Sequence, residues 1–161
     1  MPVPGRILAE IKQSKPFASL EAEAAVNLLR TADTALRAMA AVLKPHNLSA
    51  EQYNVLRILR GAGDLGLPCG EIAARMLTRD PDMTRLLDRM EARGLIGRAR
   101  DAKDRRVVTT RIRPEGLRLL DRLDGPLHEQ NRRLMGRLGK KRLRLLVALL
   151  EAVREGDARS G

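Results

Sequence analysis

Arginine is the residue type with which this sequence could do most of its chemistry, and it is concentrated between positions 93 and 113. That segment holds eight cationic side chains against two carboxylates, Asp101 and Asp104. A guanidinium group presents paired N–H donors that match phosphate oxygens, and it binds guanine in the DNA major groove in the same way. The chemistry that these residue types favour is nucleic-acid binding.

The whole chain is also strongly basic. Its 161 residues carry a formal net charge of +11, and the isoelectric point is near 11.1. A protein with this charge is attracted to DNA, RNA, acidic membranes or acidic proteins. A proteome that favours Arg and Ala would give the same totals, so charge alone does not select the partner.

Patterns typical of catalysis and metal binding are missing from the sequence. The two histidines, His46 and His128, are far apart, and the single cysteine, Cys69, has no general base beside it. No phosphate-binding glycine loop is present. We therefore expect no enzyme activity, no cofactor and no metal site. Cys69 is either a small packing residue or an oxidant sensor, and the first alternative is the simpler one.

The compartment is expected to be the cytoplasm. A single cysteine excludes an internal disulfide and fits a reducing environment. The N-terminal ten residues include Arg6 and Glu10 and lack the apolar run of a signal peptide. No stretch approaches the roughly 18 apolar residues that a membrane span needs.

The helices and strands that must position the arginines can be predicted from the spacing of apolar residues and from helix-capping residues. Phe17 and Tyr53 are the only aromatic residues, so the core should be aliphatic, which suits helices better than a β-sandwich. Ser49 and Gln52 form a capping-box pattern. The central elements expected after it are a helix from 49 to about 60, a flexible glycine-rich connector at 61–70, a short helix at 70–77, a helix at 81–93 capped by Asp80 and ended by Gly94, and two strands around the charged loop 98–106.

The helix expected at 81–93 has two distinct faces. Met83, Leu86, Leu87 and Met90 share one side and should be core. The opposite side then presents a polar set, namely Asp82, Thr84, Arg85, Asp88 and Arg89. A solvated face with Arg85 paired to Asp88 would explain an isolated helix of this kind. The basic hairpin beside it favours nucleic-acid binding instead.

Long helices should flank this central unit. Apolar residues at steps of three and four predict a helix over 19–43, ended by Pro45, and another from Pro114 that is interrupted at Gly125–Pro126. A last helix covers 140–154. Residues 1–18 are expected to be a flexible arm and residues 156–161 a frayed tail. The apolar faces of the first and last helices exceed what one small domain needs.

The order of short helix, turn, second helix and two-stranded hairpin is the winged helix-turn-helix arrangement. Within it, the strings Thr84-Arg85-Leu86-Leu87-Asp88-Arg89 and Asp104-Arg105-Arg106, followed by Gly116, resemble the recognition helix and wing of the MarR family. The close match covers roughly residues 70–116. The expected fold class is mainly α with a small β-hairpin wing, consisting of a DNA-binding lobe at 47–116 and a helical dimerisation region at 19–46 and 117–155.

The resemblance implies a function and a set of contacts. It implies a homodimeric regulator of transcription, with repression the expected sign, that binds a near-palindromic operator in double-stranded DNA. Arg106 would enter the minor groove, with its guanidinium braced by Asp104. The alternative is a basic architectural protein that binds DNA without sequence preference. The predicted DNA-binding residues are Asp82, Thr84, Arg85, Arg89, Arg100, Asp104, Arg105 and Arg106.

Three further features are interpreted from the same resemblance. Many relatives respond to small, often phenolic molecules, but two aromatic residues would make a thin stacking pocket, so an effector stays unidentified. Arg113 stands where the family commonly has a helix-capping Thr. A second basic cluster should lie on the dimerisation side as a solvated surface; it consists of Arg132, Arg133, Arg137, Lys140, Lys141, Arg142 and Arg144.

Overall fold

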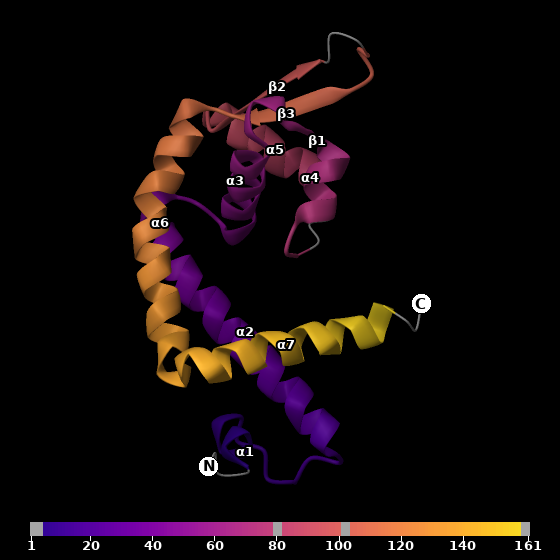
Figure 1. The fold of residues 1–161 in the computed structure, drawn as a ribbon, viewed down its shortest axis with the longest axis vertical. Helices are drawn as coiled ribbons and strands as arrows, with labels where there is room; N and C mark the ends of the chain where they lie inside the picture. Colours follow the sequence, from indigo (N-terminus) through magenta and orange to yellow (C-terminus); the bar gives the residue numbers. More distant parts are fainter. Residues whose placement is uncertain (1–4, 79–81, 101–103, 159–161) are drawn as a thin grey trace.

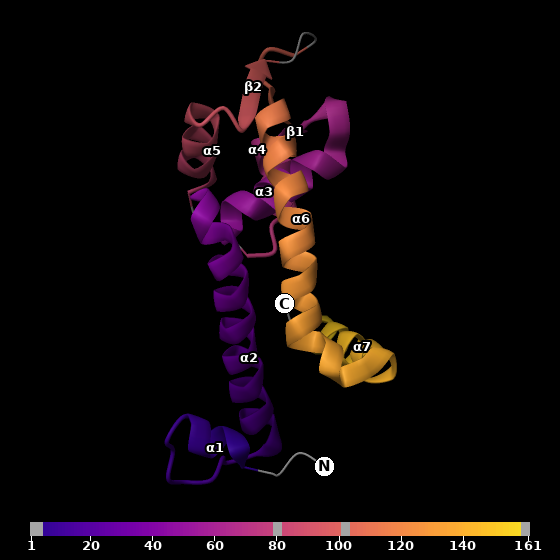
Figure 2. The ribbon, with the colours of Figure 1, turned by 90° about the vertical axis from the view of Figure 1, so that its left-hand side faces the viewer.

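The computed structural model describes residues 5–78, 82–100 and 104–158 as a lobe carried on two long helices (Figures 1 and 2). The helices of the lobe are α3 (Ala50–Ala62), α4 (Cys69–Arg75) and α5 (Met83–Ala92), and its strands are β1 (Leu67–Pro68), β2 (Ile96–Arg100) and β3 (Val108–Ile112). The two long helices are α2 (Leu20–Leu43) and α6 (Pro114–Met135). At the ends of these helices that are far from the lobe lie α1 (Arg6–Glu10) and α7 (Gly139–Ala158). Within the described residues, three short 3-10 helices complete the fold, namely η1 (Lys44–His46), η2 (Gly63–Leu65) and η3 (Gly136–Leu138). This agrees with the predicted fold class.

The core of the lobe is aliphatic, as the composition predicts. α3 begins at the expected capping box, in which the Ser49 side chain accepts from the Gln52 backbone and the Gln52 side chain accepts from the Ser49 backbone. Leu56 and Leu59 of that helix are fully buried, and Ile72 of α4 joins them, whereas the next residue, Ala73, is exposed. The largest fully buried side chains are Leu43, Leu56, Leu59, Ile72, Leu86, Leu87, Met90, Ile96, Leu120 and Leu123.

The sheet has one strand more than expected. β2 and β3 pair antiparallel as the predicted hairpin, with Ile96 opposite Ile112. β1 adds to the other edge of β3, with Leu67 opposite Thr110. The prediction of a flexible connector at 61–70 is therefore wrong. A two-residue strand has no detectable period, and Pro68 at a sheet edge needs no N–H partner there.

α6 continues through Pro126, so the predicted interruption is also wrong. A proline inside a helix removes one backbone hydrogen bond and costs about 3 kcal/mol in isolation. Here Pro126 lies on the exposed side, where water can satisfy the carbonyl that loses its donor, while Leu123 and Leu127 are buried on the other side. Packing along the whole helix outweighs the local defect.

The two ends of the chain are more regular than expected. Residues 6–10 of the predicted flexible arm form α1, in which Ile7 is only 3% exposed. One helical turn is too short to show a period in the sequence. Likewise, α7 extends to Ala158, three residues into the predicted frayed tail.

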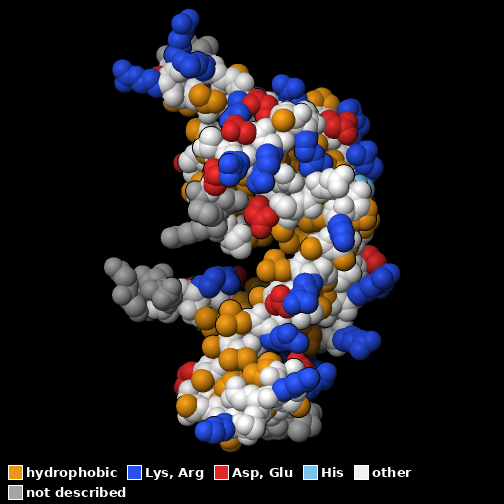
Figure 3. Space-filling view, turned by 180° about the vertical axis from the view of Figure 1, so that it is seen from behind, with side chains coloured by type: hydrophobic (Ala, Val, Ile, Leu, Met, Phe, Trp, Pro, Cys, Tyr) orange, Lys and Arg blue, Asp and Glu red, His pale blue; other side chains and the backbone are white. Residues whose placement is uncertain are grey.

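The apolar faces of α2 and α7 are largely uncovered in the single chain. Leu29 of α2 is 70% exposed and Val153 of α7 is 62% exposed. An apolar groove of about 770 Å³ lies between the two helices and is lined by Leu28, Ala32, Met135, Leu146, Leu150 and their neighbours. Figure 3 shows hydrophobic side chains gathered over this lower part of the molecule.

Candidate nucleic-acid interface

α5 has the two faces that its sequence predicts. Met83, Leu86, Leu87 and Met90 are at most 8% exposed and join the core. The opposite side carries the exposed polar set Asp82, Thr84, Arg85, Asp88 and Arg89. Burial of the apolar side fixes the rotation of the helix about its axis, and therefore fixes which side chains point into solvent.

The N-terminus of α5 lies at a different residue from the predicted one. Asp82 is the N-cap, and its carboxylate accepts a hydrogen bond of 3.1 Å from the Arg85 backbone N–H. The Arg85 guanidinium also lies 3.8 Å from that carboxylate. The predicted cap, Asp80, and the predicted first helical residue, Pro81, lie outside the described residues. Asp82 thus holds the first turn, and the Arg85 side chain stays 76% exposed.

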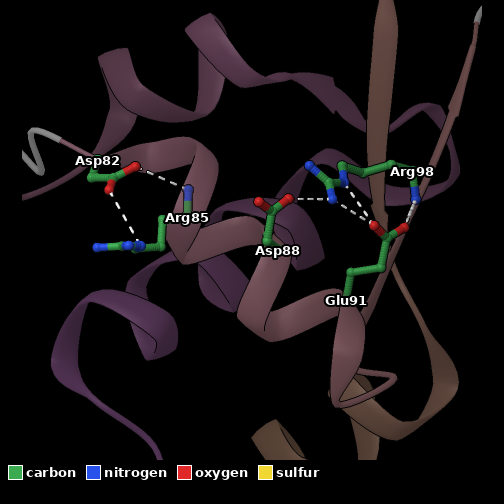
Figure 4. Close-up of polar contacts among 5 residues, drawn as sticks. All are labelled: Asp82, Arg85, Asp88, Glu91 and Arg98. Carbon is green, nitrogen blue, oxygen red and sulfur yellow. Dashed lines mark hydrogen bonds and ion pairs between the residues drawn. The ribbon is translucent and has the colours of Figure 1, made fainter.

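Arg98 of β2 joins the wing to α5 (Figure 4). Its backbone N–H and its Nε bond the two carboxylate oxygens of Glu91 at 2.9 and 2.8 Å, and its Nη2 bonds Glu91 at 2.6 Å and Asp88 at 2.5 Å. The hydrogen bonds from Arg98 hold the pKa of Glu91 below its usual value. Hydrogen bonds to Glu91 first, and then to Asp88, raise the pKa of Arg98.

This contact was missed in the sequence, although a signal was present. Asp88 and Glu91 are three residues apart and so lie on one side of α5, and Arg98 lies on the strand that follows that helix. Asp88 forms its ion pair with Arg98, and Arg85 lies near Asp82. The alternative of a solvated helix face, in which Arg85 pairs with Asp88, is therefore not what the structure shows. Because Asp88 is also close to Thr84 and Arg85 on the helix surface, the wing is held beside the exposed polar face of α5.

Arg100, Arg105 and Arg106 are exposed at the end of β2 and in the turn before β3. Asp104 accepts a hydrogen bond of 3.0 Å from the backbone N–H of Arg106, and its carbonyl oxygen accepts one of 3.0 Å from Val107. The described contact between Asp104 and Arg106 therefore shapes the backbone of the turn, whereas the sequence predicted a bond to the guanidinium. Figure 3 shows Lys and Arg side chains on the projecting tip of the lobe. Asp101 and Lys103 lie outside the described residues.

Besides Arg98, two arginines of the basic segment donate from their side chains to the protein itself. Arg93 donates to the backbone carbonyls of His46 and Asn47. Arg111 donates from Nε to the carbonyl oxygen of Asp64 at 2.7 Å. Arg113 is the N-cap of α6 and, as expected from the missing Thr, it forms no side-chain capping bond.

The remaining candidates lie away from this surface. Cys69 is a half-buried free thiol at the first position of α4, packed against the core. The second basic cluster is at the corner of α6, η3 and α7, at the opposite end of the molecule from the wing (Figure 1). There Arg132 and Arg133 both donate to the Glu129 carboxylate, and these hydrogen bonds lower the pKa of Glu129 to about 2. No helix of the described ranges is long and apolar enough to cross a membrane.

Comparison with known proteins identifies the family. The sequence model of the MarR family matches residues 48–108, which run from the N-cap of α3 into β3. The crystal structure of a MarR transcription factor from Planctomyces limnophilus is 38% identical and aligns over 85% of this chain and 99% of that chain, with a TM-score of 0.65. This chain belongs to the MarR family.

Two further relatives of this MarR-family protein have named roles. The homoprotocatechuate degradative operon repressor of Escherichia coli is 28% identical over 126 residues, which are 78% of this chain and 84% of the repressor. CouR from Rhodococcus jostii RHA1, crystallised with p-coumaroyl-CoA, is 25% identical with a TM-score of 0.71 over 85% of this chain and 95% of that chain. The winged helix-turn-helix lobe and its role in transcription regulation are thus properties of the family to which the chain belongs.

Proposed function

We propose that this protein is a transcriptional repressor that binds a near-palindromic operator as a homodimer. In this proposal α5 enters the major groove and the wing enters the adjacent minor groove of double-stranded DNA. The lobe at 47–116 binds DNA, and the helical region at 19–46 and 117–155 forms the dimer. The proposed DNA contacts are those expected from the sequence: Asp82, Thr84, Arg85, Arg89, Arg100, Asp104, Arg105 and Arg106.

The observation that carries this proposal is the fixed relation between α5 and the wing. The Arg98 contacts with Asp88 and Glu91 hold β2 against α5, so the exposed face of α5 and the wing arginines move as one unit. A helix with exposed Thr and Arg fits the major groove, where Arg binds guanine with two donors. Narrow A·T-rich minor grooves attract Arg because their negative potential is enhanced.

The homodimer is supported by the uncovered faces of α2 and α7. Leu29, Leu36, Leu149 and Val153 are each about half exposed or more in the single chain, and contiguous apolar surface of this kind marks an interaction site. A two-fold dimer would present its two α5 helices to half-sites one helical turn apart, roughly 34–36 Å. Repression is proposed because the E. coli relative is an operon repressor.

The names of the relatives suggest an aromatic acid or its derivative as the effector, although this chain has few aromatic side chains with which to bind one. The E. coli relative controls homoprotocatechuate degradation, and CouR was crystallised with p-coumaroyl-CoA. Tyr53 is 9% exposed and Arg57 lies over its ring at 5.8 Å. An effector bound in the groove between α2 and α7 would therefore depend on aliphatic contacts rather than on aromatic stacking.

Selection of bound fragments from a genomic library, followed by footprinting, tests the proposal. A repressor of this kind protects a discrete near-palindrome, and its preference for that site persists as salt is raised. The alternative, an architectural protein that only neutralises phosphates, would protect no discrete site and would lose affinity for all duplexes equally as salt rises.

A further inference from the structure

Arg93 connects the end of α5 to the end of the α2–η1 segment. It is the C-cap residue of α5, and its guanidinium donates to the Asn47 carbonyl at 2.6 Å and to the His46 carbonyl at 3.1 Å. A third bond of 3.4 Å reaches Oε1 of Gln52, the same oxygen that accepts from the Ser49 backbone in the α3 capping box. One side chain thus contacts α5, η1 and α3. Figure 2 shows α5 beside the upper end of α2.

The residue that Arg93 holds most closely ends a helical segment. Asn47 has φ 50° and ψ 42°, in the left-handed region, which asparagine adopts more readily than most other non-glycine residues and in which it can cap a helix. It is the residue at which the chain leaves η1 to enter the lobe, and its N–H bonds the Lys44 carbonyl at 3.0 Å. Asn47 lies between two helical elements, which is the kind of element-terminal position that can serve as a hinge, because a change in its two dihedral angles re-orients the lobe relative to α2.

The hydrogen bonds from the Arg93 guanidinium to the carbonyls of His46 and Asn47, here called the clasp, can fix the relative orientation of two helices. The last carbonyls of a helical segment have no intrahelical donor and carry the negative end of the helix dipole. A planar guanidinium can bond two such carbonyls at once, whereas water or a lysine ammonium cannot fix their relative direction as well. The clasp therefore stabilises one angle between α2, in the dimerisation region, and α5, in the lobe.

We propose that Arg93 is a positioning residue for DNA recognition: by holding the Asn47 hinge, it sets the angle between α2 and α5 and hence the distance between the two α5 helices of the dimer. This inference rests on the proposed function. It assigns to Arg93 no contact with DNA. The expected result of losing the clasp is tolerance of wrong half-site spacing, because a freer hinge lets each lobe adjust to its half-site.

The first experiment compares operators with the natural spacing and with one or two inserted base pairs. Arg93→Met keeps the aliphatic stem and removes the donors, and Arg93→Lys keeps the charge. Arg118→Met is the matched control, since Arg118 is an exposed arginine of α6 paired with Glu115. We expect Arg93→Met to bind the natural operator about tenfold more weakly and to lose most of the discrimination against insertions. Arg93→Lys should fall between it and wild type, and Arg118→Met should match wild type in spacing preference. An Arg93→Met protein that discriminates against insertions as wild type does overturns the proposal.

The second experiment needs no operator, so it separates this inference from the proposed function. Spin labels at Thr34→Cys on α2 and Thr84→Cys on α5, in a Cys69→Ala background, report the distance between the two helices within one chain when labelled protein is diluted into excess unlabelled protein. The distance distribution should be narrow in this background and should broaden or shift when Arg93→Met is added, with circular dichroism unchanged. If Arg93→Met unfolds the lobe, the same comparison is made with Arg93→Lys, for which a smaller broadening is expected. Identical distributions in a folded variant overturn the role of Arg93 in fixing the angle between α2 and α5. A broadened distribution without a discrete operator keeps that structural role and overturns the proposed function, together with the role of Arg93 in DNA recognition.

Discussion

Arg98 and Glu91 are joined by three hydrogen bonds of 2.6–2.9 Å that run from one strand of the wing to the last turn of the recognition helix. The two side chains are 26% and 32% exposed, so this pair is more protected from water than most of the ion pairs on the surface. Hydrogen bonds to charged groups in such settings contribute about 1.5–3 kcal/mol. The pair therefore determines how the wing stands relative to α5, as well as adding stability.

Arg98→Met should lower the free energy of unfolding by about 1–3 kcal/mol and weaken operator binding, because Glu91 loses its donors and β2 loses its attachment to α5. Denaturant unfolding and operator titration measure the two effects. Glu71→Gln, which disrupts an exposed ion pair with Arg75 on α4, is the control and should change stability by less than about 0.5 kcal/mol. Equal effects of the two variants would mean that the Arg98 contact contributes no more than a surface pair.

The same pair predicts a dependence on pH. The pKa of Glu91 is held below its usual value of 4.5 by the Arg98 hydrogen bonds. A carboxyl whose pKa is lower in the folded state stabilises the protein above the unfolded value and loses that contribution as the pH falls through the folded value. The difference in unfolding free energy between wild type and Glu91→Gln should therefore be constant above about pH 5 and shrink below 4.5. A difference that grows on acidification would contradict the assignment.

The helix start at Asp82 is testable with two substitutions. Asp82→Ala removes the acceptor for the Arg85 backbone N–H and should cost about 1 kcal/mol in unfolding free energy. Asp82→Asn keeps an acceptor oxygen and should lie close to wild type. Thermal and denaturant unfolding of both variants measures the difference. If Asn is as destabilising as Ala, the ion pair with Arg85 rather than the cap is the source of stability.

Much of the fold follows from patterns that the sequence displays directly. The alternation on α5 predicts its four buried residues because an amphipathic helix has only one way to bury its apolar side. The Ser49–Gln52 capping box is equally local, since both partners lie within one turn. The β2–β3 hairpin is indicated by β-branched residues on either side of a charged loop.

The errors arise where distant contacts decide the structure. Pro126 is a strong local helix breaker, and only the burial of Leu123 and Leu127 against the lobe and α2 keeps α6 intact. β1 forms because Leu67–Pro68 pairs with the free edge of β3. The two residues by themselves show no pattern that predicts a strand. Arg93 and Arg98 are visible in the sequence only as members of the basic segment 93–113, and neither is among the predicted DNA contacts. Their carbonyl and carboxylate partners could not be predicted, because these groups become neighbours only after folding.

Gly66 and Gly63 test the close approach of β1 to β3. Both have a positive φ, 65° and 62°, which an L residue adopts at some cost. A Cβ at Gly66 would overlap the Thr110 carbonyl oxygen and lie 2.6 Å from Cγ of Arg111, whereas a Cβ at Gly63 has nothing within 4 Å. Gly63→Ala should cost about 1–3 kcal/mol from backbone strain, because Gly63 has ψ −148° as well as a positive φ. Gly66→Ala should cost at least about 2 kcal/mol more, because β1 must move away from β3. Equal destabilisation in denaturant melts would show that the β1 pairing contributes little.

Arg85 tests the assignment of α5 to the major groove. Arg85→Ala should relax base preference at one position of each half-site and cost about 1–3 kcal/mol in binding. Selection on a randomised operator library measures the preference position by position. Arg118→Ala, an arginine of α6 outside the proposed contacts, is the control for lost charge and should leave the preferred sequence unchanged. Unchanged specificity in Arg85→Ala would remove α5 from the role of reading bases.

Arg106 tests the wing, and its effect should depend on the DNA flanking the half-sites. The Arg106 backbone is held by Asp104 in the turn of the wing while its side chain is exposed, so the guanidinium is free to enter a minor groove. A narrow A·T-rich groove concentrates negative potential and attracts an inserted arginine more strongly than a wider groove does. Arg106→Ala should therefore lose more affinity on operators with A·T-rich flanks than on operators with G·C-rich flanks.

The control is Arg105→Ala, which removes the same charge at the preceding residue. It should weaken binding to both operators by a similar factor if Arg105 binds phosphate alone. Equal losses for Arg106→Ala on the two flanks would mean that the wing neutralises phosphates without entering the groove.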